Sequence, residues 1–367
     1  MIEGHYRGQG MAFSVTRRGD ELAMDVPEAP AGVEPRLTET EGGWVIRGGP
    51  FSGVSVRPDG DGLVMADLFP MERVVDPPSL EPGHGLLAPE PPPDDPIFSD
   101  LWETAQQLDG AALDLDGVPP HRFVQWLLSR DIVIFHGSND RTIDEFLPRR
   151  TSLELHDVGG RGNLGAIYGT HDGLWSMFFA TVDRSALRGS ISNGVARYDA
   201  PDGRTVDVYH FSVSSESLPE RPFTAGALYL LPRDTFERIP FFPGGPPSPE
   251  WASHEPVRPI CRILLEPEDF PFLDDIGGHD DGPLLELEEL TNDVFDAATS
   301  AERIDGGFRF TTTADPGAVA RWAELGSSFF PDMQRTVESD ETGSAVTMTG
   351  PPALLHVMEG RLGDLID

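Results

Sequence analysis

The chain of 367 residues contains no lysine, and all 27 of its basic residues are arginine. It therefore has neither a Schiff-base amine nor the lysine of a phosphate-binding P-loop, which excludes both kinds of chemistry. Its single cysteine, Cys261, allows no disulfide within the chain. Cys261 lies in an apolar stretch with no basic residue spaced to activate it, which indicates a small buried hydrophobe and not a nucleophile.

Long apolar runs are also absent. The longest fall far short of the roughly 18 residues that a membrane-spanning helix requires. The first ten residues show no basic segment followed by an apolar core, so we expect no signal peptide and a soluble, cytoplasmic protein. Positive charge is scarce as well, with 62 acidic residues and a net charge of −35. This charge disfavours non-specific binding to nucleic acid or to an anionic membrane.

The length of the chain predicts two or three domains, and the expected fold class is multidomain α+β. Residues 1–75 contain short alternating apolar segments split by turn signals, which predicts a small antiparallel β-barrel or sandwich. Residues 76–98 are rich in proline, glycine and acids, and should form an extended linker. Residues 99–275 form the expected central domain, and residues 276–300 an acidic amphipathic connecting helix. Residues 301–367 alternate as β-α-β-α, which predicts a small α/β module.

Within the central domain, two short apolar segments are typical of buried strands. The first, residues 132–135, ends at His136, and the second, residues 166–168, ends at Tyr168. A helix should follow, because Asp172 is a suitable N-cap and apolar residues recur after it every three or four positions. Further strands are expected at residues 206–213, 227–231 and 260–265, and helices at residues 100–108, capped by Ser99, and 120–129.

The chain contains no P-loop, GxSxG, GxGxxG or HExxH sequence, so the chemistry has to come from the central domain. Three motifs there occur in a suggestive order: Phe135-His136-Gly137-Ser138, then Ala166-Ile167-Tyr168-Gly169-Thr170, then Glu250-Trp251 ahead of the apolar strand at residues 260–265. Their order and spacing resemble those of the NAD-dependent ADP-ribosyltransferases, in the branch with the poly(ADP-ribose) polymerases and tRNA 2′-phosphotransferases. The resemblance implies a split β-sheet with helices, NAD as substrate, and transfer of ADP-ribose to an acceptor that the sequence does not identify, expected to be a protein, or to water.

The resemblance also implies roles for individual residues. The His136 imidazole would bond a ribose hydroxyl, and the Gly137 N–H and C=O would hold the nicotinamide carboxamide. Ser138 would reach the second ribose or the adenine, and Tyr168 would form a flat wall for the nicotinamide. The two positions eight and eleven residues beyond Tyr168 bond the carboxamide and stack on the ring in this family. Here they are Ser176 and Phe179, where Phe179 keeps the stacking face but lacks the hydroxyl of the more usual tyrosine.

The catalytic carboxylate is assigned to Glu250, with Glu237 and Glu255 as rivals. Nicotinamide leaves as a neutral molecule, so no acid has to protonate it, whereas the ribose becomes oxocarbenium-like. Glu250 would bond the ribose 2′-hydroxyl and stabilise that cation from a Pro/Gly-rich loop before its strand. Taken singly, each of these residues has an ordinary structural explanation, and only their joint pattern points to a site.

Other interpretations remain open at this stage. Three alternatives to a transferase fit the same pattern. They are a catalytically inactive domain that binds NAD or ADP-ribose, an NAD glycohydrolase, and a structural protein whose strands only mimic the motif. The tRNA 2′-phosphotransferase activity would need basic residues such as Arg149, Arg150 and Arg161, but the net charge argues against RNA. No metal site is expected, because His279-Asp280-Asp281 and Asp274-Asp275 lack ligand spacing and are typical of solvated acidic turns.

Overall fold

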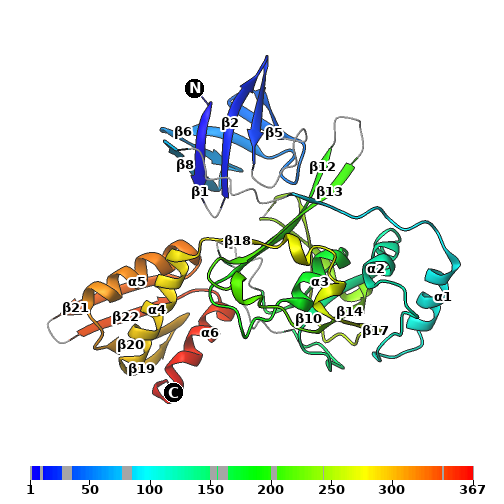
Figure 1. The fold of residues 1–367 in the computed structure, drawn as a ribbon. Helices are drawn as coiled ribbons and strands as arrows, with labels where there is room; N and C mark the ends of the chain where they lie inside the picture. The colour runs from blue at the N-terminus through cyan, green and yellow to red at the C-terminus, as the bar shows by residue number, and fades with distance from the viewer. Residues whose placement is uncertain are drawn as a thin grey trace. The chain divides into compact units, whose positions relative to one another are not determined.

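The computed structural model describes residues 2–8, 11–26, 35–76, 85–148, 155, 164–199, 205–242, 244–340 and 343–366. The chain divides into two compact units (Figure 1). The first consists of residues 1–148, 167–187 and 191–279, and the second of residues 149–166, 188–190 and 280–367. Among the described residues, no helix combines the length and the apolar composition that crossing a membrane would require.

The first unit begins with a closed eight-stranded antiparallel barrel, drawn in blue in Figure 1, which confirms the predicted small β module. The barrel is filled by apolar side chains such as Tyr6, Phe13 and Ile46, so its interior is a packed core. Phe242, from a distant hairpin, joins this core and contacts Phe69 edge-on at 5.2 Å between ring centres. The strands are β1 (Gly4–Gly8), β2 (Met11–Arg18), β3 (Glu21–Asp25), β4 (Arg36–Thr40), β5 (Gly43–Arg47), β6 (Ser55–Asp59), β7 (Gly62–Met65) and β8 (Phe69–Val74).

A six-stranded antiparallel sheet lies at the centre of the first unit, in the order β15-β16-β11-β10-β14-β17. Its strands are β10 (Val133–Ser138), β11 (Ile167–Thr170), β14 (Gly226–Pro232), β15 (Glu237–Pro240), β16 (Pro247–Ser253) and β17 (Cys261–Leu265). Helix α3 (Gly173–Thr181) covers one face, where Phe135 and Leu230 pack against Phe178. We call this the helix face. Ile134, Ile167 and Leu231 belong to a second cluster on the opposite face.

The hairpin at residues 237–253 has no clear signal in the sequence. The pattern at residues 233–241 is compatible with a turn or a short helix, but Glu237–Pro240 forms β15 after a single 3₁₀ turn. The Pro/Gly-rich segment was expected to be a loop, but its second half is β16. Prolines obscured the strand signal, because proline has no backbone N–H to donate to a neighbouring strand and is therefore disfavoured within sheets. Pro240 and Pro247 face each other near the end of this hairpin, where the register shifts.

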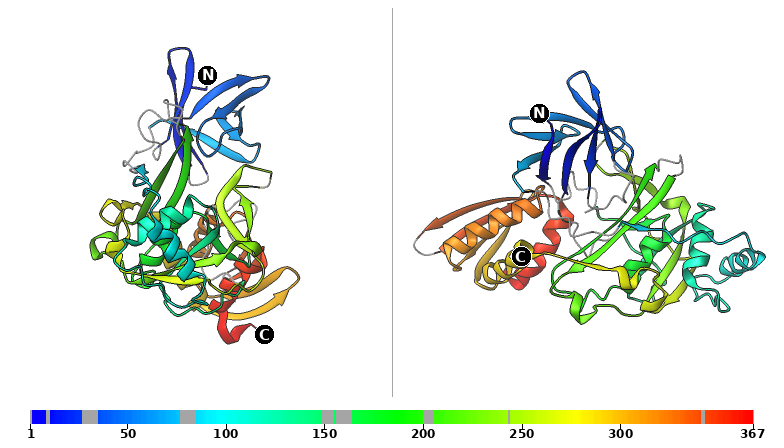
Figure 2. Two further views of the ribbon diagram at one scale, coloured as in Figure 1. Left: turned by 90° about the vertical axis from the view of Figure 1, so that its right-hand side faces the viewer. Right: turned by 45° about the horizontal axis from the view of Figure 1, so that its top comes forward.

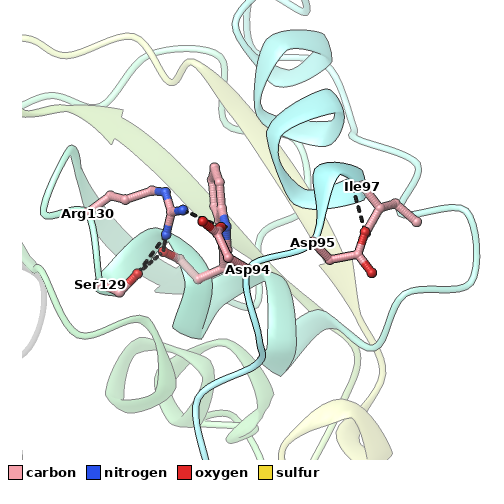
Figure 3. Close-up of polar contacts among 6 residues, drawn as sticks. Asp94, Asp95, Ile97, Ser129 and Arg130 are labelled. Atoms are coloured by element: carbon pink, nitrogen blue, oxygen red, sulfur yellow. Dashed lines mark hydrogen bonds and ion pairs between the residues drawn. The ribbon is translucent and has the colours of Figure 1, made fainter.

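Two helices precede the sheet. Helix α1 (Pro96–Ala105) begins four residues earlier than predicted, because Asp95 and not Ser99 is its N-cap: the Asp95 carboxylate accepts from the Ile97 N–H (Figure 3). Helix α2 (Pro120–Leu128) agrees with the prediction. The Arg130 guanidinium, just after α2, stacks 3.7 Å from the centre of the Trp126 ring and pairs with Asp94, which ties α2 to the segment leading into α1 (Figure 3).

A long hairpin forms a separate sheet in the first unit. Strand β13 (Thr205–Ser214) was expected, but its partner β12 (Ile191–Asp199) was not. Two short strands also pair with β13: β9 (Leu86–Leu87) and β18 (Gly277–His279). Strand β9 lies inside the expected linker. Cys261 in β17 is fully buried, and burial raises the pKa of its thiol to about 12, as expected for an inert core residue.

The second unit is a four-stranded antiparallel sheet in the order β19-β20-β22-β21, with helices whose apolar side chains share one core with it (Figures 1 and 2). Its elements are α4 (Gly282–Asp296), β19 (Ala298–Ile304), β20 (Gly307–Thr312), α5 (Pro316–Phe329), β21 (Gln334–Asp340), β22 (Gly343–Thr349) and α6 (Pro352–Leu362). The predicted β-α-β-α pattern missed β19 and β21. Both are edge strands whose residues are mostly exposed, so they carry no strong apolar alternation.

Candidate functional site

The three strands that carry the sequence motifs are neighbours in the central sheet. Strand β11, with Tyr168, lies between β10, with His136, and β16, with Glu250. One row of Cα partners crosses all three strands, from Phe135 through Thr170 to Glu250. The motifs are far apart in the sequence, so their convergence in one part of the sheet results from the strand order.

Strands β10 and β11 separate beyond this row. Phe135–Thr170 is their one pair of Cα partners, whereas β10 stays paired with β14 along its whole length. Backbone groups alternate between the two sides of a strand. The Phe135 carbonyl lies toward Gly169 on β11, and the Ser138 carbonyl lies toward Gly226, which precedes Ala227 on β14. The N–H and C=O of Gly137 therefore face β11 along the stretch where the two strands form no further described pairs, which we call the seam.

His136 lies at the seam. Its side chain is on the opposite face of the sheet, where its ring contacts Phe146 edge-on at 4.7 Å. Its Nδ1 lies 2.7 Å from the Tyr168 carbonyl oxygen. Because a carbonyl only accepts, Nδ1 carries the proton and donates, which leaves Nε2 as an acceptor in the neutral ring. Burial lowers the pKa of His136, and the nearby Arg184 charge lowers it further, while the Tyr168 hydrogen bond opposes them.

Four other predicted site residues meet on the helix face of the seam. A Cβ on Gly137 would collide with the Ser176 carbonyl oxygen and lie 3.1 Å from the Phe179 Cβ, so α3 presses directly on this strand. The Ser176 hydroxyl is buried and donates to the Phe135 carbonyl at 3.2 Å. Phe179 is only partly buried. Strand alternation places Tyr168 on this same face, because its neighbours Ile167 and Gly169 are on the other.

Ser138 is at the end of β10, where its hydroxyl accepts from the Asp140 N–H at 3.1 Å. This bond closes a local turn, and Asn139 anchors the turn to α3 by donating to the Ala180 carbonyl at 2.9 Å. Ser138 is therefore held at the mouth of the seam. Its hydroxyl can still donate to a ligand, since a hydroxyl that accepts one bond keeps its own proton.

Glu250 lies within β16, on the helix face, beside Thr170 and diagonally across from Tyr168. The strand predicted at residues 260–265 is confirmed as β17. It lies at the other edge of the sheet, so it does not position Glu250 as the motif order had indicated. His136 is separated from Glu250 by one strand, or about 10 Å between strand axes, and its side chain is on the opposite face. Tyr168 and Glu250 thus lie on the helix face, whereas the His136 side chain is on the other face. The strand register therefore does not bring His136 and Glu250 together on one face of the sheet, as their predicted shared role required.

The two rival carboxylates are less well placed. Glu237 is exposed on the edge strand β15, where it pairs with Ala252 and lies two strands from Tyr168. Glu255 is exposed beyond the end of β16, and its backbone bonds to Ser253. Glu250 is half-buried, on the strand next to Tyr168.

Sequence reasoning assigned Asp172 only as a helix cap, but it also forms a buried pair. Its Oδ1 accepts from the Trp175 N–H at 2.9 Å, and its Oδ2 accepts from the Tyr209 hydroxyl at 2.8 Å. Burial raises the pKa of Asp172 to about 6, although both hydrogen bonds favour the ionised form. Because α3 carries Ser176 and Phe179, this pair fixes the start of the helix that covers the seam.

The raised pKa makes a prediction for Asp172→Asn. The folded-state pKa lies above the unfolded value of 3.8, so ionised Asp172 costs stability above pH 6, and the cost falls as pH drops toward 3.8. When the pH is lowered from 7.5 to 5, the free energy of unfolding of the wild type should therefore rise by about 1–2 kcal/mol relative to that of Asp172→Asn. Denaturant unfolding of both proteins at the two pH values measures this. An equal difference at both pH values would contradict the prediction.

Arg149, Arg150 and Arg161 lie outside the described residues. Among the residues with described positions, no group of three or more His, Cys, Asp or Glu side chains is placed to hold a metal ion. His279 has another role, since its Nδ1 hydrogen-bonds the Ser212 hydroxyl at 2.8 Å.

No family profile, curated protein or solved structure matches this chain.

Proposed function

We propose that this protein cleaves the nicotinamide–ribose bond of NAD and transfers ADP-ribose to a protein acceptor or to water, as the ADP-ribosyltransferases it resembles do. The observation that supports this most is the seam between β10 and β11. Beside it, the outward-facing backbone of Gly137 lies close to Ser176 and Phe179. Tyr168 and Glu250 share this face on the neighbouring strands.

The geometry is suited to holding the nicotinamide. An amide group has one acceptor and two donor hydrogens, and Gly137 offers a complementary N–H and C=O facing β11, beyond the one pair that the described parts of these two strands form. Phe179 is partly exposed beside it and Tyr168 is on the adjacent strand, so the pyridinium ring would stack on these two aromatic residues. Ser176 would join the carboxamide through the hydroxyl that now donates to the Phe135 carbonyl.

The ribose would enter the seam between β10 and β11, with Glu250 on its helix face and His136 on its other face. Neutral His136 offers Nε2 as an acceptor for a ribose hydroxyl, because its Nδ1 proton is committed to Tyr168. When the C1′–N bond breaks, both electrons leave with neutral nicotinamide and positive charge develops on the ribose. The Glu250 carboxylate would stabilise that charge, and the acceptor would bond to C1′ and release its proton to solvent.

The first test is release of nicotinamide from NAD by the full chain, together with transfer of label from NAD to proteins of a lysate. The His136→Asn variant serves as the probe. The Asn amide can still donate to the Tyr168 carbonyl but offers no acceptor in place of Nε2. We expect the variant to fold normally and to cleave NAD with kcat/KM lowered about tenfold. Wild-type protein that releases no nicotinamide would refute the proposed activity.

One observation favours a second candidate, a domain that binds NAD or ADP-ribose without turnover. The Ser176 hydroxyl is buried and already bonded within the protein, so a carboxamide has to displace the Phe135 carbonyl or share the hydroxyl with it. Calorimetric binding of ADP-ribose by a protein that releases no nicotinamide would select this alternative.

A further inference from the structure

Arg184 belongs to none of the three sequence motifs, yet it lies beside two of the proposed site residues. It follows α3 in a turn, and its guanidinium carbon is 5.7 Å from the centre of the Phe179 ring. Its charge also acts on His136, on the opposite face of the sheet. Arg184 is exposed, and it lies near both the residue proposed to stack on nicotinamide and the one proposed to bond ribose.

The acid next to Arg184 in the sequence is engaged elsewhere. The Asp183 carboxylate accepts from the Ser185 hydroxyl at 2.6 Å and from the N–H groups of Ser185 and Ala186. These hydrogen bonds lower the pKa of Asp183, and the bond from the Ser185 hydroxyl has the largest effect. They also hold the turn closed. The Asp183 carboxylate is thus bonded within the turn itself.

The charge of the whole chain makes a local cation necessary for an anionic substrate. With a net charge of −35, the protein repels anions at long range, and NAD carries a diphosphate between its two riboses. A guanidinium suits a phosphate group, because its planar donors match two phosphate oxygens at once. A substrate with nicotinamide at Phe179 and ribose at His136 would place its diphosphate next along the seam.

We propose that Arg184 binds the diphosphate of NAD and makes the site selective for the dinucleotide over nicotinamide compounds without phosphate. This inference rests on the proposed function. Arg184 does not act on the reacting bond, so its contribution is to affinity. Removing it should therefore raise KM and leave kcat nearly unchanged, since the interaction is the same in the ground state and in the transition state.

The test compares the Arg184→Gln variant with wild type on NAD and on nicotinamide riboside, which has the scissile bond but no phosphate. We expect kcat/KM for NAD to fall about tenfold or more, mainly through KM, and kcat/KM for nicotinamide riboside to stay the same. The matched control is Arg258→Gln. This exposed arginine pairs with Glu145 at 3.4 Å, and its loss should affect neither substrate.

The outcomes separate this inference from the proposed function. If the wild type cleaves NAD and Arg184→Gln does so equally well, the inference fails and the function stands. Equal losses on both substrates would show a structural role for Arg184 and would also overturn the inference. If the wild type cleaves neither substrate, the activity fails, and calorimetry with ADP-ribose becomes the measurement. Weaker binding by Arg184→Gln would then support the anion site, and unchanged or absent binding would overturn it.

Discussion

Replacing Glu250 with glutamine is expected to reduce nicotinamide release from NAD by about a hundred- to a thousandfold, which is typical for the loss of one pre-aimed electrostatic group. Glutamine keeps the shape of the side chain but cannot stabilise a developing cation with a full negative charge. Strand β16 should be unaffected, because its pairing with β11 uses only the backbone. The measurement is single-turnover release of nicotinamide at saturating NAD, with circular dichroism to verify the fold.

Glu237→Gln is the matched control, since Glu237 is the nearest rival carboxylate and lies on the exposed edge strand β15. It should retain wild-type activity within about twofold. If Glu237→Gln lost the activity and Glu250→Gln kept it, the assignment of the carboxylate would be reversed. If both variants kept full activity, no carboxylate of this hairpin would take part in the reaction.

The second large effect concerns stability, at Gly137. We expect Gly137→Ala to lower the free energy of unfolding by about 3 kcal/mol, at the upper end for overpacking, because the added Cβ would meet backbone and not a flexible side chain. It would collide with the Ser176 carbonyl oxygen and lie 2.7 Å from the Ala180 nitrogen. Helix α3 would have to move away from β10, which would open the seam. Urea unfolding of the purified variant measures the change.

Gly194→Ala is the control for that measurement. Gly194 is also a strand glycine, in β12, but a Cβ there meets no atom within 4 Å. This variant should be as stable as the wild type or slightly more so, since alanine reduces the entropy of the unfolded chain. Equal stability of Gly137→Ala and Gly194→Ala would show that α3 can shift at little cost, and that the close contact does not define the site.

The arginine-only basic content, the acidic charge and the lone cysteine followed directly from the sequence. So did the elements with strong local signals. The sequence predicted the apolar strand that ends at His136, the helix after Asp172 and the presence of the barrel strands. It could do so because the periodicity of apolar residues and helix capping depend on residues close together in the chain. Strand β16 was not predictable, since Pro247 and Pro249 weaken its local signal and its strand character comes from pairing with β11.

Tertiary structure alone decided which residues meet. The seam exists because β10 and β11 separate after one pair, and nothing in either segment indicates this by itself. The placement of Arg184 beside Phe179, and of Asp172 against Tyr209, likewise depends on how α3 packs on the sheet and on β13. Such contacts are decided by packing between distant segments, whereas the sequence pattern reports only on neighbours a few residues apart.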